Sequence, residues 1–421
     1  EILIGLVGSE MCIRDSSWGE LGNQNTSNLY PFYEILPVKS NSGNWLVNGG
    51  KTNTADIPSL VSTLLTWERV RSFNVGFDFG AFSNRLTGSF DYFVRKTVDM
   101  VGPVPQLPLV LGIAPAIVNN ADMKSYGFEI ELSWRDRIGE VDYGVKFNLA
   151  DAQQKVVKYP NTTNAFSDWY AGKMSGEIWG YTSLGIAKTD EEMKEHLASL
   201  PNGGQNQLGN KWGAGDIMYA DINGDGKIDG GKGTLADPGD QRIIGNSTPR
   251  YNFGLVLDAS YKGFDVSIFF QGVGKRDYAP IVGTNGAVFW GAVNNIWQSM
   301  AMEEHFDYFR PEGHPMGANL NGYYPRPDFT SNKNHQVQTR YLQDASYIRL
   351  KNLQIGYTLP KQWINKLHIN RCRVYVSGDN LWTGTSLASM FDPETLAAGD
   401  WGSGKTYPLS KVISFGLNVN F

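Results

Sequence analysis

The stretch VISFGLNVNF, residues 412–421, alternates between apolar and small or polar side chains from Ile413 onward. Successive side chains of a β-strand point to opposite faces, so Ile413, Phe415, Leu417, Val419 and Phe421 share one face. A strand of about ten residues with one apolar and one polar face has the length and pattern needed to cross a bilayer within a β-barrel. The pattern also fits an edge strand of a soluble sandwich, so the rest of the chain has to distinguish the two.

The same period of two recurs along the chain. It predicts strands at residues 73–79, 128–134, 143–149, 251–257 and 264–270, where only Val256 and Phe269 place an apolar side chain on the polar face. In residues 347–357 the apolar residues occupy even positions up to Leu350 and odd positions from Leu353 onward. In a regular strand they would change face at this point, so a β-bulge is predicted near Lys351 and Asn352. Adding weaker candidates at residues 18–21, 86–95 and 373–379, the periodicity predicts about ten strands.

The connections between these strands alternate in length. Short turns are predicted near residues 81–84, 135–140 and 260–263, with a medium one at 360–370. Long connections are predicted at residues 22–71, 97–122, 151–250, 272–346 and 380–411, and the third can hold an extra strand pair near residues 177–187. Short periplasmic turns and long extracellular loops are typical of outer-membrane barrels, whereas a soluble sandwich has no reason to sort its loops in this way.

Composition bounds the class of protein. The chain has 421 residues and a formal net charge of −5, which gives no indication of a nucleic-acid-binding surface. No apolar run approaches the roughly 20 residues of a transmembrane helix, but a barrel conceals its apolar surface in the alternation of its strands. With two cysteines, Cys12 and Cys372, the sequence gives no indication of a disulfide framework.

The first sixteen residues, EILIGLVGSEMCIRDS, differ from the rest. They combine a short apolar run with an acidic first residue and no basic segment, so they make a poor signal peptide. The string SEMCIRDS, residues 9–16, resembles translated adaptor sequence. We therefore expect residues 1–16 to be a non-native artefact, and residues 17–421 to be the C-terminal part of a longer protein.

Several blocks of sequence resemble the C-terminal half of the SusC/RagA-like family of TonB-dependent outer-membrane transporters. The blocks occur in the family's order, at residues 17–25, 66–79, 90–97, 219–229, 242–246, 261–265, 347–353 and 375–381. The spacer at residues 230–239 is longer and richer in glycine than the usual family link. The resemblance implies an all-β fold, namely the C-terminal portion of a large antiparallel transmembrane β-barrel with long extracellular loops and no plug domain.

The resemblance also implies function, location and partners. We expect a multi-pass barrel in the cell outer membrane that imports a bulky nutrient, either an oligosaccharide or a peptide. A SusD-like surface lipoprotein would be its partner, and the TonB complex would energise import through an N-terminal part outside this chain. A terminal strand that ends on an aromatic residue resembles the assembly signal of outer-membrane proteins, here Phe415, Leu417, Val419 and Phe421.

An acidic segment suggests a metal site. Asp221, Asn223, Asp225, Lys227 (through its carbonyl) and Asp229 match oxygen-donor positions of a calcium loop, with Gly226 at the turn. The twelfth position is Lys232 instead of glutamate, although Asp237 or Asp240 could take its place. Two interpretations remain open, a calcium site and a turn whose Asn and Asp side chains cap their own backbone.

Aromatic residues in the long connections are candidates for substrate contact, because the C–H faces of sugars stack on aromatic rings. The candidates are Trp169, Tyr170, Trp290, Trp297, Tyr323 and Tyr324. For any one of them, packing within a loop or in the aromatic girdle of a barrel is the favoured alternative. We find no nucleophile elbow, phosphate-binding loop or Cys–His pairing, so we expect a protein that is not an enzyme. The alternatives to active import are a passive porin or adhesion barrel and, less favoured, a soluble carbohydrate-binding β-sandwich.

Overall fold

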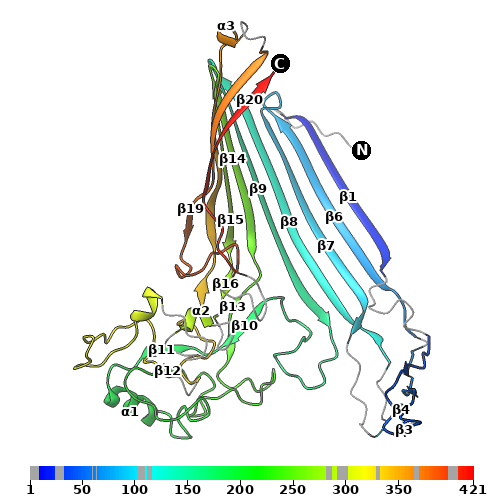
Figure 1. Ribbon diagram of the computed structural model, residues 1–421, viewed down its shortest axis with the longest axis vertical. Helices are drawn as coiled ribbons and strands as arrows, with labels where there is room; N and C mark the ends of the chain where they lie inside the picture. Colours follow the sequence, from blue (N-terminus) through cyan, green and yellow to red (C-terminus); the bar gives the residue numbers. More distant parts are fainter. Residues whose placement is uncertain are drawn as a thin grey trace.

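A computed structural model describes residues 9–23, 33–58, 60–62, 64–102, 110, 116–280, 287–291, 302–328, 332–364, 369–396 and 406–421. Ten long strands form one antiparallel sheet in the order β1-β6-β7-β8-β9-β14-β15-β18-β19-β20 (Figure 1). Their bounds are β1 Ser9–Asn23, β6 Glu68–Ala81, β7 Leu86–Gly102, β8 Val118–Ile138, β9 Val141–Lys158, β14 Arg250–Tyr261, β15 Phe264–Lys275, β18 Tyr347–Thr358, β19 Arg371–Thr385 and β20 Val412–Asn420. Each of the ten contains a segment predicted from the alternation, so the all-β prediction is confirmed.

The connections are sorted by length, as predicted. The short turns after β6, β8, β14 and β18 lie at one end of the sheet, and the long connections gather at the other (Figure 1). Between β14 and β15 the turn is Lys262–Gly263, where both residues have positive φ, at 46° and 90°. This conformation matches the right-handed twist of the flanking strands, which is why two-residue hairpin turns favour it.

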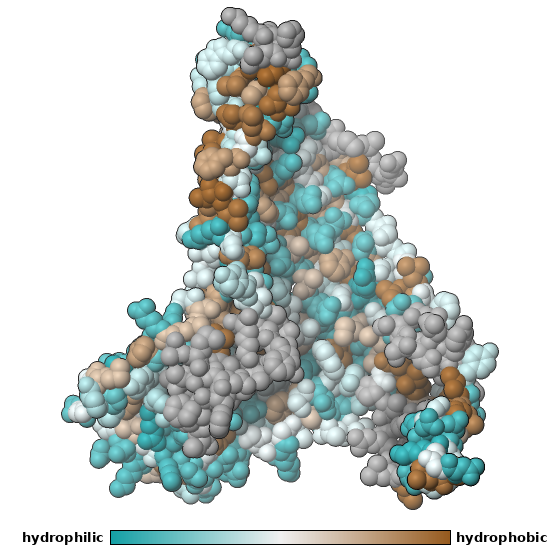
Figure 2. Space-filling model, viewed as in Figure 1, coloured by the Kyte–Doolittle hydropathy of each residue, from teal (hydrophilic) through white to brown (hydrophobic). Residues whose placement is uncertain are grey.

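The two faces of the sheet differ in chemistry. On β20, Phe415 and Leu417 lie on the outward face, with 81% and 64% of their surface exposed. Hydrophobic residues gather around the upper parts of β19 and β20 in Figure 2, whereas hydrophilic residues predominate over the middle of the sheet. The two exceptions noted in the sequence, Val256 and Phe269, are direct cross-strand partners on the inner face. Their apolar side chains therefore form a local pair within a polar wall.

The predicted bulge is present in β18. Phe269 pairs with Asn352 and Phe270 with Leu350, so Lys351 is an extra residue in the ladder with β15. The ladder with β19 shifts at the same place, between Leu350 and Asn352. The extra residue restores the phase, because Leu350 and Leu353 then fall on the same outward face.

The long connections contain the remaining elements. Two-stranded ladders join β2 Val38–Lys39 to β5 Thr54–Ala55, β3 Leu46–Val47 to β4 Gly50–Lys51, β10 Glu177–Gly180 to β13 Arg242–Asn246, β11 Ser183–Ile186 to β12 Ile217–Tyr219, and β16 Asp277–Tyr278 to β17 Gln343–Asp344. Short helices are α1 Asp190–Ala198, α2 Ala287–Trp290, η3 Glu303–Phe306 and α3 Lys361–Ile364. Near residues 177–187, where a strand pair was expected, the structure has β10 and β11, but they pair with β13 and β12 and not with each other, outside the main sheet.

Parts of three long connections share one hydrophobic core. Its buried residues come from positions 181–228, 288–345 and 387–396, and we call this assembly the long-loop body. Ile217, Tyr219, Ile228 and Phe289 are each 0% exposed within it. This is packing of the kind found in water-soluble proteins, placed at the long-connection end of the sheet.

The strand β1 includes residues 9–16, which the sequence analysis set apart. In the ladder with β6, Arg14 lies opposite Phe77 and Ser16 opposite Val75. An arginine among outward apolar residues costs about 2–4 kcal/mol at the centre of a bilayer. That residues 1–16 are non-native stays a prediction, and the position of Arg14 supports it.

Among the described residues, no helix combines the length and the apolar character needed to span a membrane.

Candidate functional site

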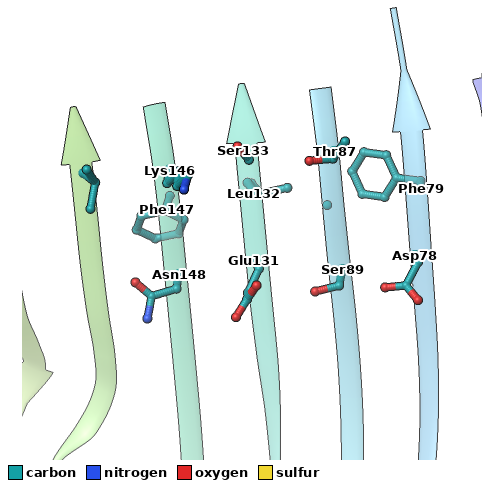
Figure 3. Close-up of a pocket in the computed structure, with 12 residues that line it drawn as sticks. Asp78, Phe79, Thr87, Ser89, Glu131, Leu132, Ser133, Lys146, Phe147 and Asn148 are labelled. Carbon is teal, nitrogen blue, oxygen red and sulfur yellow. The ribbon is translucent and has the colours of Figure 1, made fainter. Parts of the chain in front are cut away.

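The inner face of the sheet carries rows of polar side chains at matching heights. One row runs from Asp78 through Ser89 and Glu131 to Asn148, each residue being the direct cross-strand partner of the next. The neighbouring row contains Thr87, Ser133 and Lys146. These residues line a shallow hollow of about 620 Å³ across β6 to β14 (Figure 3). The wall thus offers carboxylate, hydroxyl, amide and ammonium groups to a polar solute.

A buried charge cluster joins two of the long connections. The carboxylate of Asp216, 0% exposed, accepts hydrogen bonds from Arg326 Nε at 2.7 Å, Lys333 Nζ at 2.9 Å and Asn334 Nδ2 at 2.9 Å. The hydroxyl of Tyr219 donates to the Lys333 carbonyl oxygen at 2.7 Å. Burial raises the pKa of this phenol, which therefore stays neutral. The cluster fixes the two connections to each other, because a buried carboxylate without these partners would be costly.

A second ionic cluster holds the connection after β19 against the wall. Arg349, 4% exposed, bonds Asp392 at 2.7 Å and also contacts Glu394 at 3.2 Å. Lys351, the bulge residue, bonds Glu394 at 2.9 Å. Sequence reasoning missed both clusters because no spacing rule links their members. Asp216 is more than 100 residues from Arg326 and Lys333, and Arg349 is 43 residues from Asp392.

The predicted aromatic contacts divide into two groups. Trp290 and Tyr324 are each 1% exposed in the core of the long-loop body, where the Trp290 ring also packs on Tyr341 with centroids 4.8 Å apart. Tyr323 is half-buried and packs edge-on against Tyr324. This burial leaves no face of Trp290 or Tyr324 open to a ligand, so these rings act in packing. Trp297 lies outside the described residues.

Trp169 and Tyr170 have a different setting. Trp169 is 40% exposed, and the ammonium of Lys173 lies above both rings, 5.7 Å and 5.3 Å from their centroids. The Tyr170 hydroxyl donates to Glu177 at 2.6 Å, and burial with this neighbouring carboxylate raises the pKa of Tyr170 to about 12. Of the predicted aromatic contacts, Trp169 is the one with substantial exposed ring surface in the described part of the chain.

The acidic segment is a capped turn in this structure. Asp221 accepts hydrogen bonds from the backbone N–H groups of Gly224 at 2.7 Å and Gly226 at 2.8 Å, and Asp225 accepts one from Lys227 at 3.2 Å. The Lys227 ammonium bonds Asp229 and lowers the pKa of that carboxyl. These contacts use the oxygens that calcium would need, so calcium at Asp221, Asn223, Asp225, Lys227 and Asp229 stays a prediction.

Asp240 completes the turn. Its carboxylate accepts hydrogen bonds from the backbone of Ile222 at 2.8 Å and of Asp229 at 2.9 Å, although burial raises its pKa. Asp240 therefore comes from beyond the spacer to join the acidic segment. It does so here as a cap for backbone N–H groups. Among the described residues, no group of three or more His, Cys, Asp or Glu side chains is arranged to hold a metal ion.

Comparison with known proteins identifies the family. Residues 16–381 match the family model described as TonB dependent receptor-like, beta-barrel. TonB-dependent receptor P3 of Formosa agariphila is 28% identical over 436 residues, which cover 96% of this chain and 39% of that protein. TonB-dependent receptor SusC of Bacteroides thetaiotaomicron is 21% identical, covering 96% of this chain and 37% of that protein.

A solved structure has the same fold. The structure described as the RagAB peptide transporter matches 98% of this chain and 41% of its own chain, with a TM-score of 0.69 and 23% sequence identity. The chain thus spans about two fifths of the length of the relatives that it matches. All of the family match is to the barrel, and this is a family of outer-membrane transporters, not of enzymes. The chain belongs to the TonB-dependent receptor-like β-barrel family and is SusC/RagA-like.

Proposed function

We propose that the intact protein containing this chain imports a bulky polar nutrient, an oligosaccharide or a peptide, across the outer membrane. Import would be energised through the TonB complex and assisted by a SusD-like surface lipoprotein. The observation that carries the proposal is the polar inner wall, with Asp78, Ser89, Glu131 and Asn148 aligned across four strands. A wide wall of hydrogen-bonding groups suits a solute with many polar groups along its length.

The long-loop body supports the same proposal. It is a packed unit at the long-connection end of the sheet, and ionic contacts of Arg349 and Lys351 hold its last segment against the wall. Such a unit can present a fixed surface to a solute and to a lipoprotein partner. A passive porin needs no energy coupling, so dependence on TonB is the property that separates the two functions.

Uptake by living cells tests the proposal. Cells that carry the intact protein should accumulate fluorescent oligosaccharides or oligopeptides, and accumulation should stop when the gene for TonB is deleted. Uptake that continues without TonB would establish a passive porin instead. Co-purification of a SusD-like lipoprotein with the tagged intact protein tests the partner separately.

Trp169 is the aromatic residue that we propose as a solute contact, because 40% of its surface is exposed. Trp169→Ala should raise the solute concentration needed for half-maximal uptake roughly 5- to 150-fold. This range corresponds to the loss of about 1–3 kcal/mol, which is the contribution measured when a nucleic-acid base stacks on an aromatic side chain. The matched control is Trp363→Ala in α3, which removes a ring 64% exposed at the opposite end of the sheet. Equal uptake curves for the two variants would exclude this role for Trp169.

A further inference from the structure

Four cations form one row across neighbouring strands. Arg71 on β6 pairs with Lys96 on β7, Lys96 pairs with Lys124 on β8, and Lys124 pairs with Lys155 on β9. Neighbouring strands lie about 4.8 Å apart, so the row spans roughly 14 Å. We call these four residues the basic row.

The basic row lies on the outward face, beyond the apolar band. The next row toward the short turns contains Phe73, Val94 and Tyr126 on β6 to β8, and the one after it contains Val75, Tyr92 and Phe128. On β9 these two rows end in the polar residues Gln153 and Asp151, so the apolar surface adjoins Arg71, Lys96 and Lys124. No register shift separates these rows, so all of their side chains point the same way as those of the cations. The basic row is therefore at the long-connection end of the apolar surface. Tyrosines such as Tyr92 and Tyr126 are typical of the level at which lipid headgroups begin.

The charge of the row is largely uncompensated by the protein. Arg71 bonds Glu20 at 2.7 Å, and the Lys124 ammonium lies 4.9 Å from the centre of the Tyr126 ring. Within the described part of the chain, Lys96, Lys124 and Lys155 form no ion pair with a carboxylate. Like charges directly opposite each other on adjacent strands are destabilising.

Other cations near this end of the sheet are neutralised. Arg69 bonds Asp99 at 2.5 Å, and Arg250 forms a two-point ion pair with Asp151. The chain thus supplies carboxylates to arginines on either side of the row but not to the three lysines. An anion from outside the protein would remove the repulsion and satisfy the ammonium groups.

We propose that the basic row binds the phosphorylated headgroup of an anionic glycolipid in the outer leaflet. Its phosphate would lie against Lys96, Lys124 and Lys155, while its acyl chains rest on the apolar rows that contain Val94 and Phe128. A free phosphate ion would satisfy only the charges. A lipid satisfies the charges and the adjoining apolar surface together, and the order of the rows matches the order of its two parts.

The test uses the intact outer-membrane protein in detergent micelles. The probe is monophosphoryl lipid A, a phosphorylated glycolipid, and its retention is measured by native mass spectrometry during a titration. The test variant combines Lys96→Gln, Lys124→Gln and Lys155→Gln. The control combines Lys188→Gln, Lys194→Gln and Lys232→Gln, three exposed lysines of the long connections, and so changes the net charge by the same amount.

The basic-row variant should bind the lipid about 100-fold more weakly, since each lysine near an anionic lipid surface contributes roughly fivefold in affinity. The control should bind as the native protein does, and replacing the same three residues by arginine should preserve binding. Unchanged binding by the basic-row variant would overturn the proposal. Competition by inorganic phosphate at concentrations equal to that of the lipid would also overturn it, because the site would then recognise a free anion.

Discussion

Leu132 and Leu235 are almost equally exposed, at 38% and 39%, yet they belong to regions built for different surroundings. Leu132 lies on the outward face of β8, where apolar neighbours such as Phe147 continue the same surface. Leu235 lies in a long connection, among polar residues and glycines. The sheet therefore keeps its apolar side chains at the surface and its polar ones on the inner wall. The long-loop body does the reverse and packs its apolar side chains around Phe289 and Tyr324. The exposed fraction of an apolar side chain therefore does not indicate its effect on the stability of the protein until it is known whether the side chain faces lipid or water.

The largest effect is expected where the sheet loses an entire strand. β20 pairs with β19 from Arg371↔Asn420 to Asp379↔Val412, so removing residues 412–421 leaves the backbone groups of β19 unpaired within the bilayer. Lipid offers no hydrogen bonds to replace them, so assembled barrel in the outer membrane should be lost. The measurement is heat-modifiable migration of the intact protein. Tyr407→Ala, at a residue 84% exposed in the preceding connection, is the control and should assemble normally. Normal migration of the truncated protein would contradict the expectation.

The next effect should be confined to the long-loop body. Asp216→Ala leaves Lys333 and Asn334 buried without their carboxylate, and breaking a buried ion pair in this way costs about 3–5 kcal/mol. The connections at residues 159–249 and 276–346 should become sensitive to protease while the sheet keeps its heat-modifiable migration. Glu195→Ala, at an exposed position of α1, is the control. Loss of the barrel and the loops together would show that the two regions are not separable.

The comparison between the two leucines can be tested directly. Leu132→Arg places a cation in the apolar outward face and should destabilise the barrel by about 2–4 kcal/mol in lipid. Leu235→Arg places the same side chain at nearly the same exposure in water, where surface substitutions usually stay within about 0.5 kcal/mol. Unfolding by urea of the protein folded into vesicles measures both. Equal losses of stability would mean that β8 does not face lipid.

The smallest effect concerns the acidic turn. Calcium would have to displace the Lys227 ammonium from Asp229 and the backbone N–H groups from Asp221, so binding should require roughly millimolar concentrations. At such concentrations calcium should slow proteolysis at residues 221–240 of the intact protein, and Asp221→Ala combined with Asp225→Ala should remove the protection. Identical cleavage with calcium, with chelator and in the double variant would leave only the capped turn.

Sequence reasoning succeeded where structure depends on local periodicity. Residues 264–270 and 347–357 could be assigned to strands, and the bulge at Lys351 located, because a strand alternates its faces and any break in parity is visible in the sequence. The long-loop body could not be predicted in this way. Asp216 meets Lys333, and Trp290 meets Tyr341, only after long connections have folded together. The aromatic residues of these connections therefore looked like ligand contacts, whereas most of those described are part of a core.

The bulge at Lys351 has a consequence for how β18 tolerates changes in length. Where the ladders are regular, deleting one residue moves every side chain beyond the deletion to the opposite face of the sheet. At Lys351 the ladder with β15 already skips a residue, because Phe269 pairs with Asn352 and Phe270 with Leu350. A deletion of Lys351 should therefore leave both faces of β18 in phase with β15 and remove the bond of Lys351 to Glu394. Lys351 is therefore a position at which β18 can lose a residue without its other side chains changing face.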